Sequence, residues 1–157
     1  METLMSKGNW VVGPLPGCDK TVALTRQQME EGKRRLVARA VTWLEFPEEA
    51  RAYWIGTKTD LLEIVRYVWE LQAVRTTEGV PASFRWLVLV FFTRLNVEID
   101  LRSCYALTQK ATSRKGLYMP TMLWRYCWRM FLAHNPDPLA NLVVLLPPKE
   151  KGEEKKQ

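Results

Sequence analysis

The chain has 157 residues, with 23 Lys and Arg against 17 Asp and Glu and a single His, which gives a net charge of +6. Apolar residues make up 47% and charged residues 25%, the proportions of an ordinary globular protein, and this length predicts one domain with one core. Seven Trp, five Tyr and five Phe can bury ample surface, so the composition excludes low-complexity disorder, and it fits neither a collagen-like protein nor a coiled coil.

Hydropathy and cysteine content predict a cytoplasmic protein that does not cross a membrane. The longest apolar runs, Trp86–Phe92 and Leu142–Leu146, are far shorter than the roughly 20 residues needed to span a bilayer. The first residues lack a basic stretch followed by an apolar one, so we expect no secretory signal. The three cysteines, Cys18, Cys104 and Cys127, are widely spaced and are therefore predicted to be free thiols in a reducing compartment.

The first part of the chain is predicted to be an irregular N-terminal segment, residues 1–24, followed by a helix. Glycine and proline pairs punctuate the segment, and such pairs favour turns. A helix is expected from about Thr25 to Phe46. Thr25 and Gln28 fit a capping box, in which both side chains satisfy free backbone N–H groups, and Pro47 ends the helix.

The middle of the chain is predicted to form one short helical turn and two further helices. Glu48–Tyr53 is the turn, and Thr59 is the expected N-cap of a helix that reaches about Val74. The next helix is expected over Pro81–Leu95, because proline suits a first turn and Asn96 suits the C-terminal cap.

The last part of the chain is predicted to contain two more helices, a fourth over Asp100–Ser113 and a fifth over Pro120–Ala133. The apolar stretch Leu139–Leu146 is expected to pack back on the core, and residues 147–157 form a charged, flexible tail. No pair of strands stands out. The predicted fold class is therefore all-α, with about five helices around a helix-turn-helix or winged-helix-like core, and residues 25–146 form a helical domain of DNA-binding type.

The groups that most enzymes need are missing. His134 and three scattered cysteines make no zinc pattern, and neither a C-x-x-C pair nor a glycine-rich phosphate loop occurs. Asp60 and Glu63 lie three residues apart and could share acid–base work, but favourable charge in the first turn of a helix is the preferred interpretation. Ser103 lacks a nearby base. We therefore expect no enzyme, no metal and no cofactor.

The excess positive charge is concentrated in one segment, which also has the sequence pattern of a helix-turn-helix. Residues 101–134 contain six basic residues and no acidic one, which suits a polyanionic partner. The apolar helix 81–95, the short connection 96–99 and the helix from Asp100 follow the order of that motif. The alternative is a solvated basic helix. The residues expected to face bases are Arg102, Ser103, Ala106, Gln109 and Lys110, and those expected to hold phosphates are Arg114, Lys115, Arg125 and Arg129.

The fifth predicted helix is aromatic on almost every side. A helix that is apolar all round is usually buried, so a core position is the first interpretation. Exposed Trp, Tyr and Arg are also typical of interaction hot spots. The alternative to DNA binding is therefore a helical protein-interaction module, or a homodimer joined through Trp124 and Trp128 of helix 120–133.

Three stretches resemble a known family. The block Trp54–Tyr67 resembles the signature of the RteC family, which regulates genes on conjugative transposons. Leu95–Leu101 with Tyr105 is similar to a second family motif, and Ser113–Lys115 to its basic turn. The resemblance covers roughly residues 53–132, the C-terminal half of that family's proteins.

The resemblance implies an all-helical domain with DNA-binding character and a role in transcription on a mobile element. This chain departs from the family in its shorter N-terminal part and in the strongly apolar helix 81–95. The expected function is a cytoplasmic DNA-binding transcriptional regulator of a mobile genetic element, with double-stranded DNA as partner, a homodimer as a further option, and no membrane partner. The Trp54–Tyr67 block itself is expected to be structural.

Overall fold

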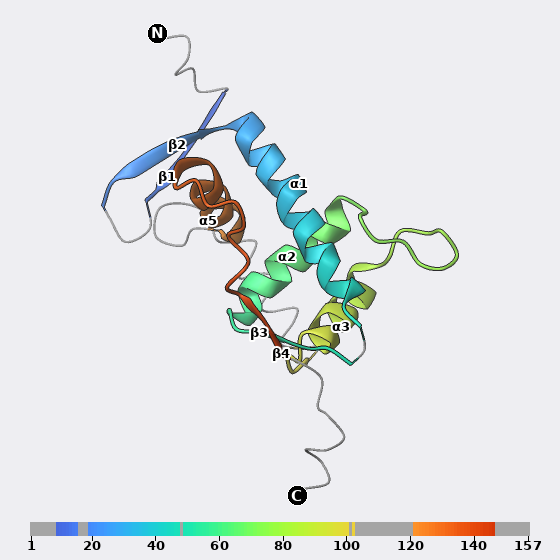
Figure 1. Ribbon diagram of the computed structural model, residues 1–157. Helices are drawn as coiled ribbons and strands as arrows, with labels where there is room; N and C mark the ends of the chain where they lie inside the picture. Colours follow the sequence, from blue (N-terminus) through green and yellow to red (C-terminus); the bar gives the residue numbers. More distant parts are fainter. Residues whose placement is uncertain (1–8, 16–18, 48, 101, 103–120, 147–157) are drawn as a thin grey trace, which may run out of the picture.

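The computed structural model describes residues 9–15, 19–47, 49–100, 102 and 121–146, and Figure 1 labels their elements. The strands are β1 (Trp10–Pro14), β2 (Thr21–Thr25), β3 (Arg51–Trp54) and β4 (Val143–Leu146). The helices are α1 (Arg26–Thr42), α2 (Lys58–Glu70), α3 (Phe84–Arg94) and α5 (Met122–Cys127), with a 3-10 turn at Trp43–Glu45 and a π-helical turn at Trp128–Leu132.

The fold is mixed, with helices and two antiparallel two-stranded sheets, β1–β2 and β3–β4. The expectation of an all-α fold with about five helices is therefore wrong. Strands of four or five residues leave too little alternation to be recognised from one sequence, and both sheets lie at the ends of a helical layer (Figure 1).

The sheet β1–β2 is a hairpin that leads directly into α1. Trp10 pairs with Thr25 and Pro14 with Thr21, so residues expected to be irregular form two strands. The hairpin packs against α5, where the Trp124 indole N–H donates to the carbonyl of Pro14 at 2.8 Å. Glycine is needed at position 13, because a Cβ there would lie 2.6 Å from the Trp124 ring.

Helix α1 begins as the sequence predicts. The Thr25 hydroxyl accepts from Gln28 N at 3.0 Å and the Gln28 side chain accepts from Thr25 N at 2.9 Å, which confirms the capping box. Gly32 is buried within the helix, and a Cβ there would overlap the sulfur of Cys127. Glycine lowers the helix propensity at this position, but its lack of a side chain permits close contact between α1 and α5.

The sheet β3–β4 joins residues far apart in the sequence. Arg51 pairs with Leu146 and Trp54 with Val143, so the stretch expected to be a helical turn at 48–53 contains a strand. The apolar stretch after Pro138 does pack on the core, since Leu139 is fully buried, and it continues as β4.

Helices α2 and α3 form where expected but with different first residues. Thr57, not Thr59, is the N-cap of α2, and its hydroxyl accepts from Asp60 N at 3.1 Å. Ser83 caps α3, and Pro81 lies outside the helix in an isolated bridge to Arg75.

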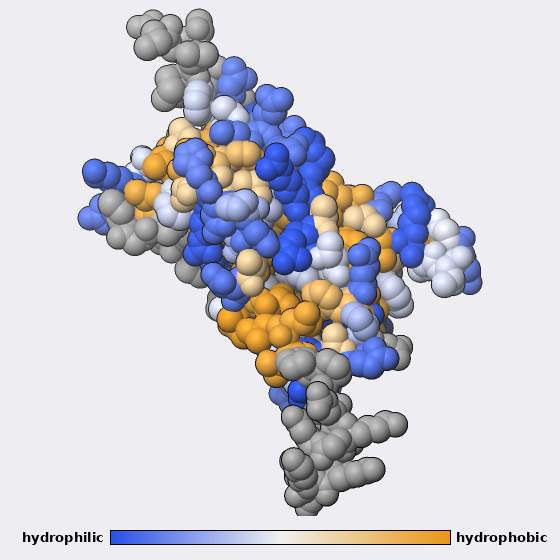
Figure 2. Space-filling view, viewed as in Figure 1, coloured by the Kyte–Doolittle hydropathy of each residue, from blue (hydrophilic) through white to orange (hydrophobic). Residues whose placement is uncertain are grey.

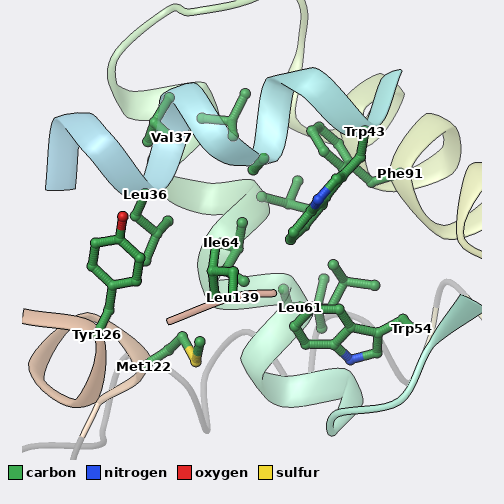
Figure 3. Close-up of a cluster of buried hydrophobic side chains, with 14 of the residues drawn as sticks. Leu36, Val37, Trp43, Trp54, Leu61, Ile64, Phe91, Met122, Tyr126 and Leu139 are labelled. Atoms are coloured by element: carbon green, nitrogen blue, oxygen red, sulfur yellow. The ribbon is translucent and has the colours of Figure 1, made fainter. Parts of the chain in front are cut away.

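The core lies where α1, α2, α3 and α5 meet, and Figure 3 shows the side chains that fill it. Leu36 of α1 and Ile64 of α2 are fully buried, and Met122 of α5 lies beside them. At the other end the Trp43 and Trp54 rings contact each other with centroids 5.8 Å apart, which joins the end of α1 to β3.

The aromatic helix is largely a core element. Trp124, Tyr126 and Cys127 of α5 are buried, and the helix continues through the π-helical turn to Leu132. Of the predicted fourth helix, 100–113, only Asp100 and Arg102 belong to the described residues, and the tail 147–157 lies outside them. No helix in the described ranges has the length and apolar character needed to cross a bilayer.

Candidate nucleic-acid interface

The segment that follows α3 turns sharply and is fixed to the sheet. Asn96 has a left-handed φ of 56°, and Val97 N donates back to Phe92 O at 2.9 Å, the pattern of a helix C-terminal cap. The Asn96 side-chain amide donates to the carbonyl of Ala52 at 2.7 Å. The cap expected at Asn96 is therefore confirmed, and it anchors the end of α3 to β3.

A second helical start follows a few residues later. The Asp100 carboxylate accepts from Arg102 N at 3.0 Å, and Arg102 is helical and exposed. Helix α3, the turn at Asn96 and the start at Asp100 thus follow in the order that the helix-turn-helix interpretation requires. Six expected site residues lie outside the described residues: Ser103, Ala106, Gln109, Lys110, Arg114 and Lys115.

Arg125, one of the expected phosphate-binding residues, forms an ion pair within the fold. Its guanidinium Nη2 lies 2.6 Å from Asp60 Oδ1, and the two side chains are only 25% and 8% exposed. A largely buried charge with an acidic partner is poorly placed to hold a phosphate. Arg125 therefore positions α5 against α2.

Arg129, the second expected phosphate-binding residue on this helix, lies on the π-helical turn and is partly exposed. Its carbonyl accepts from Asn135 N at 2.8 Å, which holds the end of the turn. Its side chain has no ion-pair partner within the described part of the chain. Arg125 and Arg129 were both expected to hold phosphates, but they differ in the structure. Arg125 is paired within the fold, whereas Arg129 is partly exposed.

Glu63 is the centre of a buried polar cluster between α2 and α5. Its Oε2 atom accepts from the Tyr67 hydroxyl at 2.7 Å and from Leu123 N at 3.0 Å, and the residue is only 3% exposed. Burial, with the Glu63 carboxylate beside it, raises the pKa of the Tyr67 hydroxyl far above its ordinary value. Glu63 thereby satisfies a backbone N–H in the first turn of α5.

The block Trp54–Tyr67 is structural, as expected. The Trp54 indole N–H donates to Thr57 O at 2.8 Å, and a Cβ at Gly56 would lie 2.7 Å from the Trp54 ring. Asp60 and Glu63 then bind α5 through Arg125 and Leu123. These residues start α2 and hold the next helix on it.

Basic side chains on α1 are paired with acidic ones. Arg34 and Arg35 both contact Glu31, at 2.5 and 3.1 Å. Lys33 lies 3.4 Å from Glu70, and Arg39 lies 3.2 Å from Asp137. These pairs neutralise much of the positive charge of α1, so α1 is a weaker candidate for phosphate contact than the acid-free segment 101–134.

The outer face of α3 lines a groove of mixed apolar and polar character that the sequence pattern did not predict. Trp86 and Leu89 are 41% and 38% exposed. The groove has a volume of about 620 Å³. Its lining consists of Ala50, Arg51, Trp86, Leu89, Val90, Thr93, Arg94 and Asn96. The near-continuous apolar sequence of α3 could have indicated this, because such a helix has more apolar residues than one buried face can hold.

The cysteine on α5 is buried and weakly acidic. Burial raises the pKa of the Cys127 thiol to about 12, so it stays protonated at neutral pH. No group of three or more His, Cys, Asp or Glu side chains within the described ranges is arranged to hold a metal ion.

Comparisons of the chain with protein-family models, with curated proteins and with solved structures found no match in any of the three. The resemblance to the RteC family therefore stays a prediction. The candidate interface consists of the turn after α3, the exposed Arg102, the partly exposed Arg129 and the basic sequence around them.

Proposed function

We propose that this protein is a cytoplasmic DNA-binding regulator that reads duplex DNA with the segment 100–113. We further propose that it acts in transcription on a mobile genetic element, in line with the resemblance to the RteC family. The observation that carries the first proposal is the turn at Asn96 followed by a helical start at Asp100, because a helix-turn-helix requires this order directly after its first helix.

The charge of the following sequence supports the same proposal. Residues 101–134 contain six basic residues and no acid. The ion pair of Arg125 with Asp60 removes one of the six from the proposed contacts. The remaining basic residues fall into two roles, with Arg102 and Lys110 facing bases and Arg114, Lys115 and Arg129 holding phosphates.

Fluorescence anisotropy with labelled mixed-sequence duplex DNA tests the proposal. If roughly three phosphate contacts form, affinity should fall about fortyfold between about 50 and 200 mM salt. Affinity that does not change with salt, or no binding at low salt, would contradict DNA binding through this segment.

Single substitutions separate the two roles. Lys115→Ala should weaken binding to every sequence alike, whereas Arg102→Ala should change the sequence preference found in a site selection. Lys20→Ala is the matched control, since Lys20 is exposed in the loop between β1 and β2, far along the chain from the proposed segment. A loss from Arg102→Ala that is equal for all sequences would exclude a base-reading role.

A protein-interaction role is the second candidate, and the groove along α3, with the exposed Trp86 and Leu89, favours it. An interaction through helix 120–133, which was expected from the sequence, is less well supported, because Trp124 is 5% exposed and hydrogen-bonded to Pro14. Substituting Trp86, which is 41% exposed, with Ala should abolish such an interaction and leave DNA binding unchanged.

A further inference from the structure

The sheet β3–β4 has one edge that the fold covers. Trp54 N donates to Leu95 O at 3.1 Å, and Ala52 O accepts from the Asn96 side chain at 2.7 Å. Ala52 and Trp54 therefore direct their backbone groups away from β4, and the end of α3 bonds the Trp54 N–H and the Ala52 carbonyl. In an antiparallel pair, successive residues point alternately toward and away from the partner strand. This alternation fixes which residues of β4 face outward.

Within the described ranges of the chain, the other edge of the sheet is open. Ile55 N donates to Leu142 O at 2.9 Å, one pair beyond the strand, so Leu142 and Val144 face β3. By alternation, Val143 and Leu145 direct their N–H and C=O groups outward. No hydrogen bond joins the backbone of these two residues to another segment among the described residues. Natural sheets rarely leave such an edge apolar and unprotected.

The open edge also carries exposed apolar side chains. Val144, Leu145 and Leu146 are 40%, 53% and 39% exposed, and Ile55 is 59% exposed. Figure 2 shows a continuous hydrophobic patch where Figure 1 draws β3 and β4. Residues 138–148 contain no charged residue, so nothing on this stretch repels an identical strand.

We infer that this edge pairs with β4 of a second copy of the chain, which makes a continuous four-stranded sheet across a two-fold axis. With the axis at Val144, Val143 lies opposite the partner's Leu145, and both outward-facing residues of each chain are bonded. Leu142 then faces the partner's Leu146, so every cross-strand pair is apolar. The surface is self-complementary, as a two-fold interface requires.

The arrangement closes at two copies. Each chain offers one open edge of this sheet, because the end of α3 occupies the other. A four-residue strand gives a small contact, so we expect a dissociation constant on the order of 10–100 µM. This inference does not depend on the proposed DNA binding.

Sedimentation velocity of the full chain from about 5 to about 500 µM tests the inference, since that range brackets the expected constant. The wild type should pass from monomer to dimer. Val144→Lys should raise the dissociation constant at least about tenfold, because it places two like charges against each other at the axis. Val12→Lys is the matched control, an exposed valine in a strand of the other sheet, and should dimerise normally.

Two further variants test the register and guard against misfolding. An equimolar mixture of Val144→Lys and Val144→Glu should restore the dimer that neither variant forms alone. Leu145→Pro should also abolish the dimer yet fold, because the N–H it removes points away from β3. A wild type that stays monomeric, a species larger than the dimer, or a Val144→Lys variant that dimerises like the wild type would overturn the inference.

Discussion

The charged contacts along α1 and those between α2 and α5 use the same residue types in different surroundings. On α1, Glu31 is 37% exposed and its partners Arg34 and Arg35 are 60% and 54% exposed. Between the helices, Asp60 is 8% exposed and Arg125 is 25% exposed. Exposed pairs contribute little, whereas breaking a buried pair leaves a charge that water no longer solvates.

The difference shows which charges the fold depends on. The pairs of Glu31 with Arg34 and Arg35 join residues within one helix and add nothing to tertiary structure. Asp60 and Glu63 instead bind a helix about sixty residues later in the chain, through Arg125 and the backbone of Leu123. The two acids therefore determine where α5 lies, and substitutions in the two regions should differ sharply in effect.

The largest effect is expected at Glu63. Glu63→Ala should lower the free energy of unfolding by about 4 kcal/mol, because it leaves the buried Tyr67 hydroxyl and Leu123 N–H without their acceptor. Glu63→Gln, which keeps one acceptor oxygen, should cost about 2 kcal/mol. Urea unfolding followed by circular dichroism measures both. A loss below about 1 kcal/mol for Glu63→Ala would mean that water reaches the cluster.

An intermediate effect is expected at Asp60. Asp60→Asn keeps the shape and removes the charge, so Arg125 loses its partner while a quarter of its side chain still reaches solvent. We expect a loss of about 2 kcal/mol in the same unfolding experiment. Asp60→Asn combined with Arg125→Met should recover part of that loss, because no unpaired charge remains. If the double variant were no more stable than Asp60→Asn alone, the unpaired charge of Arg125 would not be the cause of the lost stability.

The smallest effect is expected at Glu31. Its arginine partners hold the pKa of Glu31 below its ordinary value. A lowered carboxyl pKa contributes stability at neutral pH that is lost as the pH falls through the lowered value. Solvent screens this exposed pair, so Glu31→Gln should match the wild type within error at about pH 7 and at about pH 3. If the wild type were clearly more stable than Glu31→Gln at pH 7 but not at pH 3, the exposed pairs of α1 would contribute to stability as the buried pair does.

Local signals in the sequence predicted the helices well. The capping box at Thr25 and Gln28, the stop before Pro47 and the cap at Asn96 each depend on residues within a few positions, and all three are confirmed. The strands could not be predicted in the same way. β3 is short, and its partner β4 lies in the last part of the chain, so its pairing depends on the tertiary fold.

The amino-acid composition of the candidate interface could be predicted from the sequence, but the contacts of its side chains could not. The sequence alone shows the excess of basic residues over 101–134. It does not show that Arg125 pairs with Asp60, because that contact joins separate helices. The interpretation of Asp60 and Glu63 as favourable first-turn charges was incomplete for the same reason. A buried acid and a distant arginine become a pair only when α2 and α5 come together.

The pairing of β3 with β4 also sets the order in which the chain can fold. The ribosome releases α1 and α2 long before α5 and β4, yet Gly32 packs against Cys127 and Glu63 accepts from Leu123 N, both in α5. We expect the nascent chain to keep these surfaces of α1 and α2 exposed until α5 has been synthesised. Contacts of such high sequence separation slow folding and favour chaperone binding meanwhile.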